Sequence, residues 1–321
     1  MADRRLAGVL LAASGAIAFS GKAIIVKLGY RHGVDAVTLL ALRMLVALPP
    51  FVAMAVWARR GERARIGRGD AWRIGALGFF GYYLASFLDF AGLATISATL
   101  ERLILYLTPS LVLAIGFLVH GRRVGGRQLA ALALSYAGVL LAFGHDLRLG
   151  GRDVLLGGAL VFASALSYAV YLVGSGELVG RIGALRLTAY ASIVACVLCL
   201  VQFALVDGVG ALAEVAPAVW GLSLLNGTLC TVFPVAAVML AIARIGPGLT
   251  AQIGMLGPVS TIVLSMLVLG EAMGPWQIAG TVLVLIGVLA ASRREPARPD
   301  ERPPAGALAD PGPIDTRRGP R

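Results

Sequence analysis

The sequence has few charged residues, and this scarcity excludes most classes of soluble protein. Only 14% of its 321 residues are Asp, Glu, Lys or Arg, whereas 58% are hydrophobic and the mean hydropathy is +0.85. Soluble domains carry about 25% charged residues, and a soluble core could not bury this much apolar surface. A bilayer-spanning helix needs roughly 20 apolar residues. Because such runs recur from residue 6 to residue 292, nearly the whole chain is expected to lie in a membrane.

Histidine and cysteine are also scarce, with three of each. The histidines fall at predicted loops or helix ends, and Cys196 and Cys199 lie one helical turn apart without a nearby histidine to complete a metal site. No GxxxxGK[ST] nucleotide-binding loop is present. We therefore predict no metal, no cofactor, no ATP hydrolysis and no catalytic residue, and an intramembrane enzyme is the less favoured alternative.

What the sequence does contain is a series of apolar segments, each long enough for a membrane helix. There are ten, at residues 6–28, 36–57, 72–93, 96–119, 129–143, 154–173, 187–206, 218–241, 249–269 and 276–291. The first is too long for the core of a signal peptide and is interpreted as a permanent helix. The sequence thus predicts an all-α polytopic membrane protein with ten transmembrane helices.

Positive charge is concentrated in short loops, which argues for a membrane topology signal and against nucleic-acid binding. The formal net charge is +11. Ten helices with Met1 in the cytoplasm place the arginine-rich stretches 59–73, 122–127 and 181–186 on the cytoplasmic side. By the positive-inside rule we expect a multi-pass inner-membrane protein with both termini cytoplasmic. Residues 293–321 are rich in Pro, Arg and Asp, which predicts a disordered cytoplasmic tail.

The two halves of the chain repeat each other at an offset of 149 (258 minus 109). The paired positions are Leu107-Thr108-Pro109 with Leu256-Gly257-Pro258, Gly121 with Gly270, Gln128 with Gln277, and Gly138-Val139 with Gly287-Val288. Five helices per repeat is an odd number, so the second repeat must be inverted relative to the first. We expect five-helix repeats at residues 1–145 and 146–292, the architecture of many secondary transporters.

These motifs resemble the EamA family of the drug/metabolite transporter superfamily. The resemblance covers residues 6–291 and rests on the helices with Pro109 or Pro258, on Gly270-Glu271, on Gln277 and on Ile286-Gly287-Val288. It implies a small-molecule carrier that exports or exchanges amino acids or related metabolites, with drugs and nucleotide or lipid-linked sugars as alternative substrates. Arg122 stands where the family often has Glu, which favours a loop-capping role for Glu271. A channel is the rival mechanism, but the repeat favours alternating access.

Ionisable residues inside a membrane usually face a cavity or a partner. Lys22, Arg43, Asp89 and Glu101 are predicted roughly 6–11 Å below the outer ends of their helices, counted at about 1.5 Å per residue. They could therefore share one cavity, or Lys22 could pair with a carboxylate as structural glue. Lys22 and Lys27 are the only lysines of the chain, and Lys27 is expected to extend to the outer interface. Because Glu101 and the adjacent Arg102 are about 100° apart on a helix, one of them is expected to point to a neighbouring helix.

A lysine in the first helix favours a substrate with a negative group, such as a carboxylate. We predict a substrate site comprising Lys22, Arg43, Asp89, Glu101, Tyr83, Tyr168, Tyr171 and Asn226. The uncharged members could instead bond neighbouring helices. Asp89 and Glu101 could carry a coupling proton. The sequence leaves open the substrate, the direction of transport, the coupling ion and the oligomeric state, a homodimer included.

Overall fold

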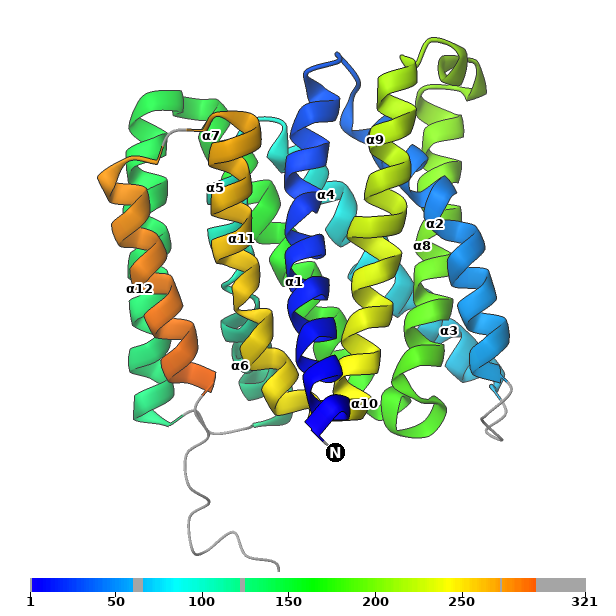
Figure 1. Ribbon diagram of the computed structural model, residues 1–321, viewed down its shortest axis with the longest axis horizontal. Coiled ribbons are helices and arrows are strands. Elements are labelled where there is room, and N and C mark those ends of the chain that lie inside the picture. The colour runs from blue at the N-terminus through cyan, green and yellow to red at the C-terminus, as the bar shows by residue number, and fades with distance from the viewer. Residues whose placement is uncertain (1, 60–65, 122–124, 272, 293–321) are drawn as a thin grey trace, which may run out of the picture.

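The computed structural model describes residues 2–59, 66–121, 125–271 and 273–292 (Figure 1). Its helices are α1 (Ala2–Tyr30), α2 (Ala36–Arg59), α3 (Arg68–Gly78), η1 (Phe79–Leu84), α4 (Ala85–Leu93), α5 (Ala98–Leu105), α6 (Thr108–His120), α7 (Gly126–Ile182), α8 (Ala184–Val206), η2 (Val209–Ala213), α9 (Pro217–Gly227), η3 (Thr228–Val232), α10 (Phe233–Gly254), α11 (Leu256–Leu264), η4 (Ser265–Leu269) and α12 (Pro275–Ser292). Arg122 and the tail predicted at 293–321 lie outside the described residues.

These elements form membrane-spanning helices. The described residues contain nine helices long and apolar enough to cross a membrane, together with the shorter apolar helix Pro275–Ala290. The long helix α7 contains two consecutive spans, and α10 contains the end of one span and the start of the next. In each case the two spans meet at one glycine in a left-handed conformation. Gly151 has φ 56° and Gly246 has φ 78°, values that glycine adopts without steric cost. The predicted all-α polytopic fold is confirmed.

The spans cross the molecule in alternating directions. The first helix begins on the face at the bottom of Figure 1, and the last described helix ends on that same face. We call this the N-terminal face, and we call the opposite face, where α1 ends at Tyr30 and α12 begins at Pro275, the distal face. On the distal face the Asp35 side chain accepts hydrogen bonds from the N–H groups of Val37 and Thr38 and so starts α2.

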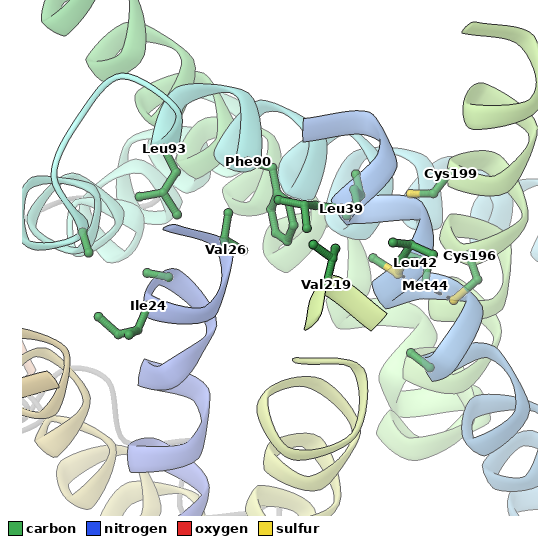
Figure 2. Packing of buried hydrophobic residues seen from close by; sticks show 14 of the residues in the cluster. Ile24, Val26, Leu39, Leu42, Met44, Phe90, Leu93, Cys196, Cys199 and Val219 are labelled. Atoms are coloured by element: carbon green, nitrogen blue, oxygen red, sulfur yellow. Dashed lines mark hydrogen bonds between the residues drawn. The ribbon is translucent and has the colours of Figure 1, made fainter. Parts of the chain in front are cut away.

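Large apolar side chains cover the outside of the bundle, as expected for a surface in contact with lipid. Leu118 and Leu267 are each 78% exposed, and Leu205 is 81% exposed. The interior contains an apolar cluster in which α2 contacts α8, with Cys196 and Cys199 of α8 packed close to Met44 of α2 (Figure 2). Cys196 and Cys199 therefore pack as apolar residues in the interior.

The repeat is visible in local backbone geometry at the offset of 149. Gly121 and Gly270 each end a helix with positive φ, 62° and 71°. Gln128 and Gln277 each accept a hydrogen bond through Oε1 from the N–H three residues earlier, at Gly125 and Gly274. Each repeat also has a break in its helix shortly before the matching proline, at residues 106–107 before Pro109 and at residue 255 before Pro258. These local structures recur because the same turn-forming residues recur.

Two π-helical segments also correspond, since η1 begins at Phe79 and η3 begins at Thr228, again 149 residues apart (228 minus 79). The preceding glycines, Gly78 and Gly227, sit against the backbones of other spans. A Cβ on Gly78 would lie 2.8 Å from the Ala191 carbonyl oxygen of α8, and one on Gly227 would lie 2.9 Å from the Arg43 carbonyl oxygen of α2. The third and eighth spans are thus packed equivalently, as the predicted inverted repeat requires.

Candidate functional site

The most deeply buried charges of the distal half form one cluster, which joins α1, α4 and α5. Lys22 Nζ lies 2.5 Å from Asp89 Oδ2 and 3.2 Å from Glu101 Oε1. The side chains are 7%, 5% and 0% exposed in the same order. The predicted proximity of these three residues is therefore present as direct contact, and we call Lys22, Asp89, Glu101 and Arg102 the buried charge cluster.

Arg102 completes this cluster, although the sequence analysis did not select it. Its Nε lies 3.8 Å from Glu101 Oε2, and its guanidinium carbon lies 5.4 Å from the centre of the Phe19 ring. Lys22 Nζ lies 5.6 Å from the centre of the same ring. Glu101 and Arg102 therefore both reach the neighbouring helix α1, where one of them was expected to point to a neighbouring helix. The 3.8 Å contact and the position of Phe19 show that long side chains can compensate for the angle between adjacent residues.

The cluster is balanced in charge but incomplete in hydrogen bonding. Two cations face two carboxylates, so the formal charges cancel. Within the described part of the chain, however, buried polar atoms are left without a hydrogen bond, namely Asp89 Oδ1, both Glu101 carboxylate oxygens, and Arg102 Nε and Nη2. Unsatisfied buried polar atoms are costly and often mark a binding site.

The cluster lies where the two repeats meet. Ser20, two residues before Lys22, donates a hydrogen bond of 2.7 Å to the Gly257 carbonyl oxygen of α11. Thr99, two residues before Glu101, bonds the Ser265 hydroxyl of η4 at 3.1 Å. Inverted-repeat transporters form their substrate sites at such interfaces. Movement of the second repeat would therefore directly change the surroundings of the cluster.

Arg43 is buried next to this cluster but has different partners. Its Nε donates to the Thr231 hydroxyl at 2.8 Å, and its guanidinium carbon lies 5.3 Å from the centre of the Phe90 ring. Thr231 in turn donates to the Asn226 backbone oxygen at 2.8 Å. The structure thus links the predicted residues Arg43 and Asn226 through Thr231, which was not among the predicted site residues.

The predicted tyrosines fall into two places. Tyr168 and Tyr171 of α7 stack with ring centres 5.6 Å apart, and the Tyr171 hydroxyl lies 3.3 Å from that of Tyr82. Tyr82 was not predicted. Tyr83 instead packs with Phe79, at 5.4 Å between ring centres, against the apolar core. At the repeat offset of 149, Tyr171 corresponds to Lys22 (171 minus 22), so the tyrosine group and the buried charge cluster occupy equivalent positions.

Glu271 serves as a helix cap, in agreement with the role that the sequence favoured. Its Oε1 accepts a hydrogen bond of 3.2 Å from the N–H of Ala98, the first residue of α5. A carboxylate is stabilised there by unpaired N–H groups and the helix dipole. The cap connects the end of the ninth span to the helix that carries Glu101.

The fold, with two inverted repeats of membrane helices around a buried polar site, is that of a secondary transporter. The sequence matches the EamA-like transporter family twice, over residues 6–144 and 155–293. The chain therefore belongs to the EamA-like transporter family. Because this is a family of transporters, membership decides against the intramembrane enzyme that was the alternative.

Curated relatives and a solved structure agree with this assignment. The chain is 31% identical over 283 residues to the uncharacterized transporter YcbK of Bacillus subtilis, covering 85% of this chain and 89% of that protein. It is 26% identical over 221 residues to the uncharacterized transporter YyaM of the same species, covering 68% and 71%. A protein of known crystal structure aligns with 88% of this chain and 96% of its own chain, with 18% sequence identity and a TM-score of 0.60. At this identity the likeness supports the fold alone.

Proposed function

We propose that this transporter exports or exchanges amino acids or related small carboxylate metabolites by alternating access. The observation that carries the proposal is the buried charge cluster, in which a lysine ammonium sits at the repeat interface beside carboxylates with unused oxygens. An ammonium at this depth is costly unless it is paired. A substrate carboxylate can take the place of Asp89 on Lys22 and keep the ammonium paired throughout transport.

Orientation follows from charge. Arginines concentrate in the loops of the N-terminal face, so that face is proposed to be cytoplasmic and the membrane to be the cell inner membrane. In the described conformation, Lys22 and both carboxylates are almost fully buried. This conformation is then an occluded one, and opening toward either side must expose the cluster.

Charge balance suggests how transport is coupled. The cluster is neutral, so an organic acid without an ammonium group adds one negative charge to a site of low dielectric, whereas a zwitterionic amino acid adds none. Protonation of Asp89 or Glu101 would restore neutrality with the organic acid, which makes one proton per organic acid the proposed stoichiometry. An imposed pH gradient should change the rate of carboxylate flux in proteoliposomes, and flux that ignores the gradient would rule out this coupling.

The substrate class is tested by thermal stabilisation of the purified protein. A ligand that binds the native state raises the apparent Tm. Amino acids and organic acids are expected to raise it, and Lys22→Gln in combination with Asp89→Asn, which removes one charge of each sign, is expected to abolish the shift. Shifts with only cationic drugs or sugars, or a carboxylate shift that survives in the double variant, would contradict the proposal.

A further inference from the structure

The distal face carries a second charged site, separate from the buried charge cluster. A cavity of about 290 Å³ opens there, lined by Lys27, Tyr30, Arg31, Ala94, Leu269 and Glu271. We call it the distal vestibule. Ligand pockets for drug-sized molecules range over roughly 300–1,000 Å³, so this volume suits a small metabolite.

Opposite charges line the vestibule. Lys27 and Arg31 extend from the end of α1, and Glu271 follows the end of η4. Among the residues that the structure describes, neither Lys27 nor Glu271 forms an ion pair. In this conformation the described part of the cavity therefore presents an ammonium and a carboxylate that are not joined in a direct ion pair.

Capping accounts for only half of the Glu271 carboxylate. Oε1 accepts the Ala98 N–H, while Oε2 is buried and has no hydrogen-bond partner in the described structure. A buried carboxylate oxygen without a donor costs free energy unless a ligand supplies one. An ammonium group is the donor that matches its charge.

The walls of the vestibule are held in place by hydrogen bonds. Arg31 Nη2 donates to the Leu269 carbonyl oxygen at 2.6 Å, and the Tyr30 hydroxyl donates to the Phe90 carbonyl oxygen at 2.5 Å. Phe90 directly follows Asp89, so the vestibule wall is tied to the helix of the buried charge cluster. Lys27 lies five residues beyond Lys22 on α1, about 7.5 Å closer to the distal face at 1.5 Å per residue.

From these contacts we infer that the distal vestibule binds a zwitterionic α-amino acid. The carboxylate of the solute pairs with Lys27, and its ammonium donates to Glu271 Oε2. The substrate class is taken from the proposed function, but the site is distinct from Lys22 and can fail separately. A molecule with only one of the two charges leaves either Lys27 or Glu271 unpaired and binds more weakly.

The test is protection of a thiol placed in the vestibule of the detergent-purified protein. Ala94 is an exposed lining residue, whereas the native cysteines are all buried, so Ala94→Cys supplies the reactive thiol. Each of the common L-α-amino acids is tested for slowing of its alkylation by a maleimide. We expect at least one to slow the reaction several-fold, while its N-acetyl and amide derivatives, which each lack one charge, protect weakly.

Matched variants locate the effect. Lys27→Gln and Glu271→Gln should each abolish protection, and glutamine at 271 still offers an oxygen to the Ala98 N–H, so the cap survives. Lys22→Gln combined with Asp89→Asn, which keeps the buried charges balanced, should leave protection intact. A thiol at Val209, which is 67% exposed in η2 on the same face, should react at an unchanged rate.

Several outcomes would overturn the inference. These are an unreactive Ala94→Cys thiol, protection by none of the amino acids, equal protection by the singly charged derivatives, or protection that survives Glu271→Gln. Protection lost in the Lys22→Gln, Asp89→Asn double variant would place the solute in the buried charge cluster instead, which overturns the vestibule and spares the proposed function. Protection of the thiol without any transport of the amino acid would overturn the proposed function and leave the vestibule site standing.

Discussion

At the scale of single residues, the buried charge cluster is a set of mutually dependent charges. Lys22 neutralises Asp89 and part of Glu101 within the membrane interior. Removing one member of a buried pair leaves an uncompensated charge, whereas removing both members restores balance. This difference separates the structural role of the pair from its role in transport.

The first prediction follows from this balance. Lys22→Gln should lower the free energy of unfolding by about 3–5 kcal/mol, because Asp89 is left buried and unpaired. Adding Asp89→Asn should recover most of that loss without restoring transport. Thermal unfolding and substrate counterflow of the same preparations provide the two readouts. Normal transport by the double variant would show that Lys22 and Asp89 only stabilise the fold and are not needed for transport.

A second prediction concerns Thr231, whose hydroxyl links Arg43 to the Asn226 backbone. Thr231→Val keeps the shape but leaves Arg43 Nε without its acceptor, which should destabilise the protein by about 1.5–3 kcal/mol, as for hydrogen bonds to charged groups. Thr228→Val, in the same π-helix, removes only an exposed bond to the Leu224 carbonyl oxygen and serves as the control. Equal changes in denaturant-induced unfolding for both variants would contradict the role given to Thr231.

At the scale of elements, the paired π-helices η1 and η3 rotate the residues that follow them. A π-turn adds one residue to a helical turn, so each later side chain is shifted by about 100° from its α-helical position. Asp89 follows η1 and therefore depends on it for its direction toward Lys22. π-helical turns often occur at functional sites, and here both adjoin tightly packed glycines.

The third prediction tests that packing. Gly78→Ala and Gly227→Ala would each place a Cβ under 3 Å from a carbonyl oxygen of another span, and should each destabilise the protein by about 1–3 kcal/mol through overpacking. Gly75 and Gly221, on the same helices, have no neighbouring atom within 4 Å of an added Cβ. Alanine there should be neutral or slightly stabilising. Tm values that do not distinguish the two sets would contradict the observed close approach.

The same elements show how far sequence reasoning extends. Depth along a helix can be counted from its ends, which is why Lys22, Asp89 and Glu101 were predicted to lie together. Rotation about the helix axis depends on packing and on π-turns, which have no simple sequence signal. For this reason the contacts of Arg102, Thr231 and Tyr82 were missed, and the substrate role of the site remains a prediction.

At the scale of the whole molecule, the inverted repeat was predictable because its markers are local. Gly270, Gln277 and Pro258 act on the turns and helix starts in which they lie, and the same residue types recur at the offset of 149. The long helix α7 was less predictable, since it continues through residues 144–150, which were expected to form a loop. Glycine and polar residues there favour a break, but only Gly151 provides it.

The repeats also differ in chemistry at equivalent positions. The first supplies Lys22, whereas the second supplies Tyr171, so the proposed pathway is charged in one half and aromatic in the other. An inverted carrier alternates by exchanging the conformations of its repeats. Substrate would then meet Lys22 and the tyrosine group from opposite sides of the membrane, with a carboxylate contact on one side and ring contacts on the other.

The most direct test of the account is substrate counterflow in proteoliposomes. Liposomes preloaded with amino acids, and others with organic acids, are diluted into trace radiolabelled solute, for the parent protein, for Lys22→Gln with Asp89→Asn, and for Arg148→Gln as an exposed control. We expect labelled carboxylate to accumulate transiently with the parent and the control and not with the double variant. Equal accumulation with all three, or accumulation of none of these solutes by the parent, would contradict transport of carboxylates through the buried charge cluster.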